Sequence, residues 1–494
     1  MGMQYYDVII VGAGLSGIGA AYHLQRQCPG KTFSILEGRD AIGGTWDLFR
    51  YPGIRSDSDM YTLGYEFKPW HGGKVLADGP SIRRYVEETA KDSHIIEHIQ
   101  FNQMVQRADW DSASATWTVT TEQKDGSILQ HQANMLLLCA GYYNYESGYE
   151  PDFPGKENFK GEYVRPQHWP ESLDYKDKRV VVIGSGATAV TIVPSMAEDV
   201  EHITMLQRSP TYMANRPQID RWEQVLGKVL PRKTLYSFIR WKNATMQRML
   251  YGATRRWPGA IKKMFLKQVR KQLPDYDVDT HFTPSYNPWD QRLCAVPEND
   301  IFEAIKSGKA DVVTDHIDHF TESGIKLKSG TELPADIVVA ATGLQLVVNG
   351  KIKFTRDGEA VDFADTWSYH GTMFTGVPNA VATFGYINAS WTLRADLIAN
   401  FFCGLMNHMQ SKGANTVEPK LRDSDRDMTA KQWIEDFPSG YMARSMHLFP
   451  KQGDRTPWIN TQNYTYEKRV IGKANYDDGV LTYSTAKTDQ NAAA

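Results

Sequence analysis

A cluster of glycines near the start of the chain has the spacing that lets a backbone approach a phosphate group. Gly12, Gly14 and Gly17 stand at and after the end of the apolar run DVIIVG, residues 7–12, and lead into a helical pattern. The first glycine permits a tight turn, the second admits a pyrophosphate, and the third lets the helix pack on the strand. Since the helix N-terminus then faces the phosphates, the spacing predicts a nucleotide-binding loop.

An acidic residue at the right distance strengthens this prediction. The strand-like stretch TFSILE ends at Glu37, twenty residues after Gly17. A carboxylate at that point can accept hydrogen bonds from ribose hydroxyls, as in FAD or NAD sites. A turn with no ligand is the alternative interpretation. Strand, loop, helix, strand and terminal acid together favour the nucleotide site.

The same unit recurs in the middle of the chain. RVVVIGSGATAV, residues 179–190, contains a strand followed by Gly184, Gly186 and Ala189. The next strand, HITMLQRS, ends near Arg208 and Ser209 in place of an acid. A guanidinium grips phosphate in a bidentate manner, so this unit is predicted to bind NADP through its 2′-phosphate. The alternative for Arg208 is a solvated surface arginine.

Two such sites indicate hydride transfer from NADPH to a flavin, and the cysteines exclude one destination for the electrons. Disulfide reductases have this layout but need a redox-active cysteine pair. The four cysteines here are scattered and include no CxxC pair, which also fits a reducing, cytoplasmic location. Their positions are Cys28, Cys139, Cys294 and Cys403.

Each half closes with a further apolar strand, at residues 134–141 and 335–343. We therefore predict an α/β fold with two nested Rossmann-like dinucleotide-binding domains and a helical insert. The predicted parts are an FAD domain in two pieces (1–142 and 341–484), an NADP domain (143–340) that contains the insert (216–280), and a disordered tail (485–494).

Charge and hydropathy limit the partners. The formal net charge of −3 does not indicate nucleic acid. Residues 216–272 hold 15 Lys/Arg and only 2 Asp/Glu, and their spacing predicts helices with a basic outer face. A solvated insert is the favoured interpretation, and contact with an anionic membrane surface is the alternative. No run approaches the ~20 apolar residues of a membrane span, and we expect no signal peptide. Nothing in the sequence indicates the oligomeric state.

One metal motif is set aside. His94-Ile95-Ile96-Glu97-His98 matches HxxEH, an inverted zinc-protease motif. That motif requires a helix, whereas this stretch follows an expected helix at 81–92 and runs into a strand-like sequence. We therefore predict no metal site.

Two longer motifs resemble a known family. GGTWDLFRYPGIRSD, residues 43–57, resembles the pattern [A/G]GxWxxxx[F/Y]P[G/M]xxxD of class B, type I Baeyer–Villiger flavin monooxygenases. FKGEYVRPQHWP, residues 159–170, resembles their FxGxxxHxxx[W/Y]P fingerprint, and DIVVAATG (336–343) resembles their DxxxxATG segment. The stretches at 286–305 and 388–392 are similar to the ethionamide-activating branch of that family. The resemblance covers essentially the whole chain.

The resemblance implies a function and roles for particular residues. NADPH reduces FAD, O₂ adds to the flavin as a C4a-peroxyflavin, and one oxygen atom is inserted into a ketone to form an ester. Arg292 matches the active-site arginine that stabilises the anionic oxygen, and Asp57 matches the acid that orients it. Gly44 and Trp46 are expected beside the flavin, and Asn388 and Trp391 near the substrate or nicotinamide, with a core role open for Trp391.

One position departs from the family pattern. The fingerprint has histidine where this chain has Arg165, and Trp169 completes the motif. In the family this connector sets the relative placement of the two nucleotide domains. Arginine retains a donor but cannot act as a neutral acceptor near pH 7. We therefore expect normal flavin loading and altered coupling between NADPH use and product formation.

Three alternatives remain open. A flavin N- or S-oxygenase would act on heteroatoms only, and the branch that this chain resembles also oxidises sulfides and thioamides, so both activities can coexist. An NADPH oxidase would release peroxide without an organic substrate. A nucleotide sensor would bind both dinucleotides without flavin reduction.

Overall fold

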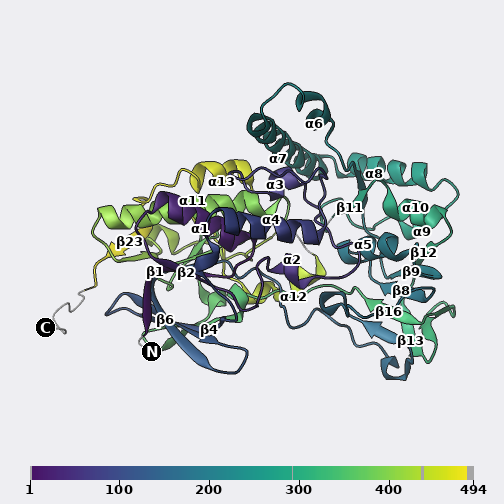
Figure 1. Ribbon diagram of the computed structural model, residues 1–494, viewed down its shortest axis with the longest axis horizontal. Coiled ribbons are helices and arrows are strands. Elements are labelled where there is room, and N and C mark those ends of the chain that lie inside the picture. Colours follow the sequence, from purple (N-terminus) through teal and green to yellow (C-terminus); the bar gives the residue numbers. More distant parts are fainter. Residues whose placement is uncertain (1–2, 292, 436–438, 487–494) are drawn as a thin grey trace.

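The computed structural model describes residues 3–291, 293–435 and 439–486. Figure 1 shows a larger body built around one sheet with β1, β2, β4 and β6, and a smaller one around a second sheet with β8, β9, β12 and β16. Helices α6 and α7 stand above both in this view.

The first sheet contains nine strands and carries the N-terminal glycine unit. Its buried central strand β1 pairs in parallel with β2 and β6, which brings the ends of all three to one edge. The order is β18 (Glu359–Val361), β17 (Lys353–Arg356), β4 (Met104–Asp111), β5 (Thr116–Glu122), β6 (Ile128–Leu138), β1 (Gln4–Val11), β2 (Phe33–Leu36) and β3 (Ile99–Gln100), while β21 (Ala380–Ala382) also pairs with β6.

The second sheet is entirely parallel and carries the other glycine unit. Its short apolar strands are of the kind that is covered on both faces. Their order is β12 (Ala310–Thr314), β9 (His202–Gln207), β8 (Arg179–Ile183), β16 (Ile337–Ala340) and β7 (Glu162–Val164). Strand β7 lies within the fingerprint stretch, so part of that connector forms an edge strand of this sheet.

Helices and small ribbons complete the two bodies. Helix α1 (Leu15–Gln27) packs along α11 (Trp391–Ser411), and α5 (Ala187–Met196) follows the second glycine loop. The other helices are α2 (Thr45–Leu48), α3 (Met60–Leu63), α4 (Gly79–Asp92), α10 (Asp300–Lys306), α12 (Gly440–Ser445) and α13 (Tyr464–Val470). Smaller sheets pair β13 (Ile317–Thr321), β14 (Gly324–Leu327) and β15 (Glu332–Pro334), then β19 (Ser368–Tyr369) with β20 (Met373–Phe374), and β22 (Thr416–Pro419) with β23 (Leu481–Ser484).

The basic segment folds as the helices that its spacing predicts. They are α6 (Arg221–Leu226), α7 (Arg232–Arg256), α8 (Pro258–Gln272) and α9 (Val278–His281), flanked by the parallel pair β10 (Met213–Arg216) and β11 (Cys294–Pro297). Among the described residues, no helix is both long and apolar enough to cross a membrane.

The structure confirms the predicted α/β class, because each glycine loop lies in a parallel βαβ unit. Strands β17, β18 and β21 rejoin the first sheet after the second is complete. The exact domain limits stay a prediction. Thr485 and Ala486, assigned to a disordered tail, differ from that expectation because they hydrogen-bond to Gly413 and Asn415; residues 487–494 lie outside the described part. Helix α4 ends at Asp92, so the HxxEH stretch is not helical through His94.

A buried arginine attaches the insert to the first body. Arg240, on α7, donates to the carbonyl oxygens of Tyr61, Thr62 and Gly64 at 2.8, 3.2 and 2.6 Å. Its guanidinium also pairs with Asp396 of α11 at 3.3 Å. Both side chains are buried, so removing the cation leaves a charge and three carbonyls without their donor.

We predict that Arg240→Met lowers the free energy of unfolding by about 3–5 kcal/mol, the range for breaking one side of a buried ion pair. Chemical denaturation followed by circular dichroism measures this. Arg232→Met, at the exposed start of the same helix, is the control and is expected to change stability by less than about 0.5 kcal/mol. Equal effects of the two variants would contradict the anchoring role.

Candidate functional site

A cavity of about 470 Å³ lies where the first glycine loop, the 43–57 turn and the start of α5 meet. This volume is within the range of small-molecule and cofactor sites. The predicted residues that line it are Gly12, Gly14, Glu37, Gly44, Trp46, Asp57, Asn388 and Trp391. The structure thus brings together residues that stand far apart in the sequence.

The first glycine loop has the conformation that its spacing predicts. Gly12 has a φ of +101°, and a Cβ there would lie 2.7 Å from the carbonyl oxygen of Cys139. A Cβ on Gly17 would lie 1.9 Å from the carbonyl oxygen of Gly12, so that glycine is required by helix packing. Gly14 differs, because its Cβ would meet Gly44 only at 3.8 Å. Gly14 therefore leaves open the space that a pyrophosphate needs.

Glu37 follows β2 directly and is held by backbone donors. The N–H groups of Ala13 and Arg39 donate to its two carboxylate oxygens at 2.7 and 2.9 Å. Burial raises the pKa of Glu37, against the opposing effect of these two hydrogen bonds. The carboxylate is therefore fixed in the wall of the cavity, as the predicted ribose contact requires.

Three arginines converge on Asp47 behind the GGTW turn. Arg50 and Arg83 lie 2.8 and 3.1 Å from its carboxylate, and Arg39 forms a third ion pair with it. Asp47 is almost fully buried. This cluster fixes the turn that presents Gly44 and Trp46 to the cavity.

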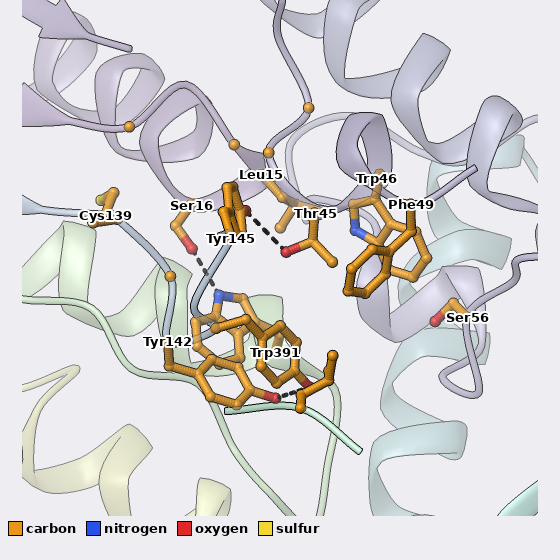
Figure 2. A pocket seen from close by; sticks show the side chains of 18 of the residues that line it. Leu15, Ser16, Thr45, Trp46, Phe49, Ser56, Cys139, Tyr142, Tyr145 and Trp391 are labelled. Atoms are coloured by element: carbon orange, nitrogen blue, oxygen red, sulfur yellow. Dashed lines mark hydrogen bonds between the residues drawn. The ribbon is translucent and has the colours of Figure 1, made fainter. Parts of the chain in front are cut away.

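Aromatic and hydroxyl side chains form the inner wall (Figure 2). The Trp391 indole donates to the Ser16 hydroxyl at 2.7 Å and stacks on Tyr142 with ring centroids 4.9 Å apart. Tyr145 and Thr45 hydroxyls are 3.1 Å apart, and burial raises the pKa of Tyr145 to about 12. Trp391 therefore contacts the first glycine loop directly through Ser16 and also packs against the hydrophobic core.

The tyrosines of this wall were missed by the sequence reasoning. They stand in GYYNY, residues 141–145, directly after the third strand of the first unit. The residues after the carboxyl ends of parallel strands gather at one edge of the sheet, where ligands bind. That position was the available signal.

Two further predicted residues border the cavity, and one cannot be placed. The Asn388 amide donates to the carbonyl oxygen of Gln462 at 3.0 Å, and Asp57 lines the cavity from the loop before α3. Arg292 lies outside the described residues, while its neighbour Leu293 lines the cavity.

The second glycine loop is open to solvent. Gly184 has a φ of +135°, with its Cβ position 2.3 Å from the Ala341 carbonyl oxygen. Nothing lies within 4 Å of a Cβ on Gly186, which caps α5 without a side-chain hydrogen bond. Ser185 donates to the Ser209 carbonyl at 2.9 Å, which ties the loop to the end of β9 beside exposed Arg208. Ala189 is buried in α5.

The two units meet through the 43–57 turn. Phe49, Tyr51 and Ile54 belong to the hydrophobic core of the five-stranded sheet. The Tyr51 hydroxyl is hydrogen-bonded to Thr188 of α5, and burial raises the pKa of Tyr51. A Cβ on Gly53 would lie 1.8 Å from the Ser195 hydroxyl oxygen. The turn beside the first loop is thus packed tightly against the helix of the second.

The fingerprint connector borders a second cavity of about 40 Å³ that also includes Thr188. Arg165 is exposed there and forms an ion pair with Glu150, which Lys156 also contacts. Trp169 lines neither of these two cavities but packs near Tyr175, with ring centroids 6.5 Å apart.

Comparisons with known proteins agree with this architecture. A family model described as flavin-binding monooxygenase-like matches residues 76–349, and one described as an NAD(P)-binding Rossmann-like domain matches residues 10–88. The chain is 50% identical to the FAD-containing monooxygenase EthA of Mycobacterium tuberculosis, over 97% of this chain and 98% of the relative. It is 47% identical to the probable FAD-binding monooxygenase AlmA of Acinetobacter baylyi, over 98% and 97% of the two chains.

Solved structures share the fold at low identity. An oxidized steroid monooxygenase bound to NADP superposes with a TM-score of 0.79 at 21% identity, covering 98% of this chain and 100% of the other. An OTEMO complex with FAD and NADP gives a TM-score of 0.76 at 20% identity, with the same coverage. These likenesses concern the fold.

The glycine geometry generates a prediction that separates binding from folding. Gly14→Ala is expected to fold, because its Cβ has ordinary contacts, but to lose FAD, because the methyl group enters the pyrophosphate space. Flavin absorbance per protein after purification measures FAD content, and we expect at least a tenfold loss of affinity (~1.4 kcal/mol). Gly186→Ala is the matched control in the second loop and is expected to retain FAD. Normal FAD content in Gly14→Ala would contradict the assignment.

Proposed function

The chain belongs to the flavin-binding monooxygenase-like family, which bears out its motif resemblance, and we propose that it is an NADPH- and O₂-dependent enzyme that inserts one oxygen atom into ketones and also oxidises sulfides or thioamides. The observation that supports this proposal is the cavity in which Asp57, the first glycine loop and the start of α5 meet. Such a junction lets a nicotinamide, a flavin and a small substrate approach one another.

The residues at the first loop fit FAD. The open backbone at Gly14 accepts a pyrophosphate at the N-terminus of α1, and the fixed Glu37 carboxylate accepts ribose hydroxyls. Gly44 has a φ of +56°, and its Cβ position is 3.3 Å from both the Gly14 Cα and the Tyr145 hydroxyl, so a side chain there would close the site. FAD as cofactor agrees with the relative at 50% identity, which is described as FAD-containing.

The residues at the second loop fit NADP. Gly186 leaves the N-terminus of α5 open for a pyrophosphate, and Arg208 is exposed at the end of β9, where a 2′-phosphate would lie. Ser209 stands beside it and its carbonyl is held by Ser185. NADP agrees with the NADP that is bound to the steroid monooxygenase of the same fold.

Bound FAD, reduced by NADPH, supplies the electrons that activate O₂, and the chain supplies charge and a dry pocket. We assign to Arg292 the stabilisation of negative charge on the reacting oxygen and on the carbonyl oxygen of the substrate. This role rests on the motif match and on Leu293, which lines the cavity. Asp57, also at the cavity, is assigned the orientation of that arginine.

The apolar wall has a second task, the exclusion of water. Phe49, Tyr142 and Trp391 face the cavity, and Leu344 and Ile387 extend the same wall. Electrostatic stabilisation is stronger where water is excluded. This apolar part of the wall also favours uncharged ketones and thioethers over charged substrates.

We predict that Arg292→Ala lowers the rate of ester formation from a panel of ketones by a factor on the order of 10²–10³, the usual effect of removing one preorganised donor. Sulfoxide formation from a thioether is expected to persist, because it does not need a stabilised oxygen anion. Asp57→Asn is expected to lower ester formation less. Product analysis by gas chromatography measures both reactions, and Lys328→Ala is the control at an exposed site.

The alternatives give different results in the same assay. Sulfoxide without any ester from the unmutated protein would select a heteroatom oxygenase. Peroxide equal to the NADPH consumed, unchanged by any ketone or thioether, would select an NADPH oxidase. Binding of both nucleotides without flavin reduction would select a sensor.

We predict that Arg165→His keeps FAD content and stability but changes coupling. Arg165 is half exposed and pairs with Glu150, and such surface pairs contribute at most about 1 kcal/mol. The replacement removes a permanent charge at the border of the cavity that includes Thr188. The ratio of peroxide to product, measured with NADPH consumption, is expected to change. If this ratio and turnover are both unaltered, Arg165 has a purely structural role.

A further inference from the structure

Exposed apolar side chains are concentrated in the basic insert. Of the eighteen large hydrophobic residues that are exposed in the described part of the chain, nine lie between Ile219 and Met264. Scattered exposed hydrophobics are normal on protein surfaces, but a concentration of them marks an interaction site.

The most prominent group forms what we call the helical tip, residues 219–241, made of α6, the following turn and the start of α7. Figure 1 shows α6 and the start of α7 standing above the rest of the molecule. Trp222, Val225, Val229 and Trp241 are 51%, 66%, 74% and 64% exposed. Trp222 and Val225 stand three residues apart on α6, and Val229 follows in the turn after this helix.

The tip is a built surface with an inner and an outer side. On the inner side, Leu226 and Leu230 pack against a buried cluster that includes Tyr61, Leu235 and Ile239. Half-buried Phe238 also packs against this cluster, and its ring centroid lies 6.1 Å from that of exposed Trp222 and 6.2 Å from that of exposed Trp241, so the three rings are in contact. Leu226 and Leu230 are thus half-buried, whereas Trp222, Val225, Val229 and Trp241 are exposed.

The exposed charged groups of the tip are basic. Arg221, Lys228, Arg232 and Lys233 are exposed, and none of these four makes an ion pair with any described residue. The acids of the tip are engaged elsewhere. Asp220 pairs with Lys242 at 2.5 Å, and Glu223 is hydrogen-bonded to Tyr61. The outer face therefore carries uncompensated positive charge around an apolar patch.

We propose that the helical tip docks on the surface of an anionic phospholipid bilayer. Tryptophan and aliphatic side chains enter the boundary between headgroups and acyl chains, and lysine and arginine attract anionic headgroups. The same charges oppose the pairing of two copies through this face, because like charges would meet across the contact.

The position of the tip links docking to the substrate, a step that rests on the proposed function. Helix α7 carries exposed Trp241 and, six residues later, Gln247, which lines the main cavity. Ala214 and Arg216, just before the tip, line the same cavity. A ketone or thioether dissolved in a bilayer would thus meet the enzyme beside its cavity.

Vesicle flotation of the FAD-loaded protein tests docking without any substrate. We expect binding to vesicles of phosphatidylcholine mixed with phosphatidylglycerol, weaker binding to phosphatidylcholine alone, and a decrease as salt rises. Val225→Asp/Val229→Asp and Lys228→Glu/Lys233→Glu are each expected to lower binding at least about tenfold, since each basic residue near such a surface contributes ~1 kcal/mol.

Matched controls use exposed residues elsewhere. Ile128→Asp, 57% exposed on β6, and Lys328→Glu/Lys353→Glu, both exposed, are expected to bind as the unmutated protein does. Flavin content and melting temperature confirm folding in every variant. No binding to anionic vesicles, or equal binding by tip and control variants, would overturn the proposal. A tip variant that changes the oligomeric state measured by light scattering, without changing flotation, would assign the tip to a second copy instead.

A second assay addresses substrate delivery. Ester formation from a long-chain ketone held in anionic vesicles is expected to fall at least fivefold in the tip variants, while a short, water-soluble ketone is converted as before. Flotation that succeeds with no product from either ketone would contradict the proposed function and leave docking intact. Equal conversion of the vesicle-held ketone by all variants would overturn delivery.

Discussion

In each nucleotide-binding unit, one backbone carbonyl group lies against the first glycine of the loop and positions the segments around the site. The carbonyl of Cys139 passes over Gly12, and the carbonyl of Ala341 passes over Gly184, each so closely that a side chain at the glycine is impossible. Only a residue without a Cβ can turn the chain from strand to helix under such a crossing. As a consequence, the segment after the third strand of each unit is held against the mouth of the glycine loop. In the first unit this segment supplies Tyr142 and Tyr145 to the cavity wall.

This constraint explains which features could be predicted from the sequence. Glycine spacing, strand length and the acid or base after the second strand are local patterns, so the α/β fold and the placement of Glu37 and Arg208 followed from them. The contacts that join the units are different. Tyr51 meets Thr188, and three arginines meet Asp47, through residues whose types have no periodic pattern. The partner of Arg165, Glu150, was likewise hidden, because an exposed ion pair has no signature in the surrounding sequence.

The stiff connector of residues 159–170 now has a physical explanation. Val164 belongs to β7, the edge strand beside β16, and Pro166 begins a short 3-10 helix directly afterwards. Gln167 is buried and donates to the carbonyl oxygen of Asn144, in the tyrosine-rich segment of the first unit. One short stretch is therefore bound to both units. Its backbone is restrained by a strand, a proline and a buried amide, so the connector is a structurally restrained link between the two units.

The helical insert completes what two Rossmann-like units cannot provide by themselves. Each unit presents a nucleotide site at the edge of its sheet, which is by nature open to solvent, whereas oxygen chemistry at a flavin needs a covered pocket. Gln247 of the insert lines the cavity, as does Trp289 in the loop after the insert, and buried Arg240 attaches α7, the helix of Gln247, to the first body. Because Arg240 alone anchors α7 through a buried charge, the other basic side chains of the helix do not need to be buried. The surplus of basic residues in 216–272 is compatible with a stable fold, because Arg240 is the one of them that is buried. Arg221, Lys228, Arg232 and Lys233 remain exposed for recognition at the surface.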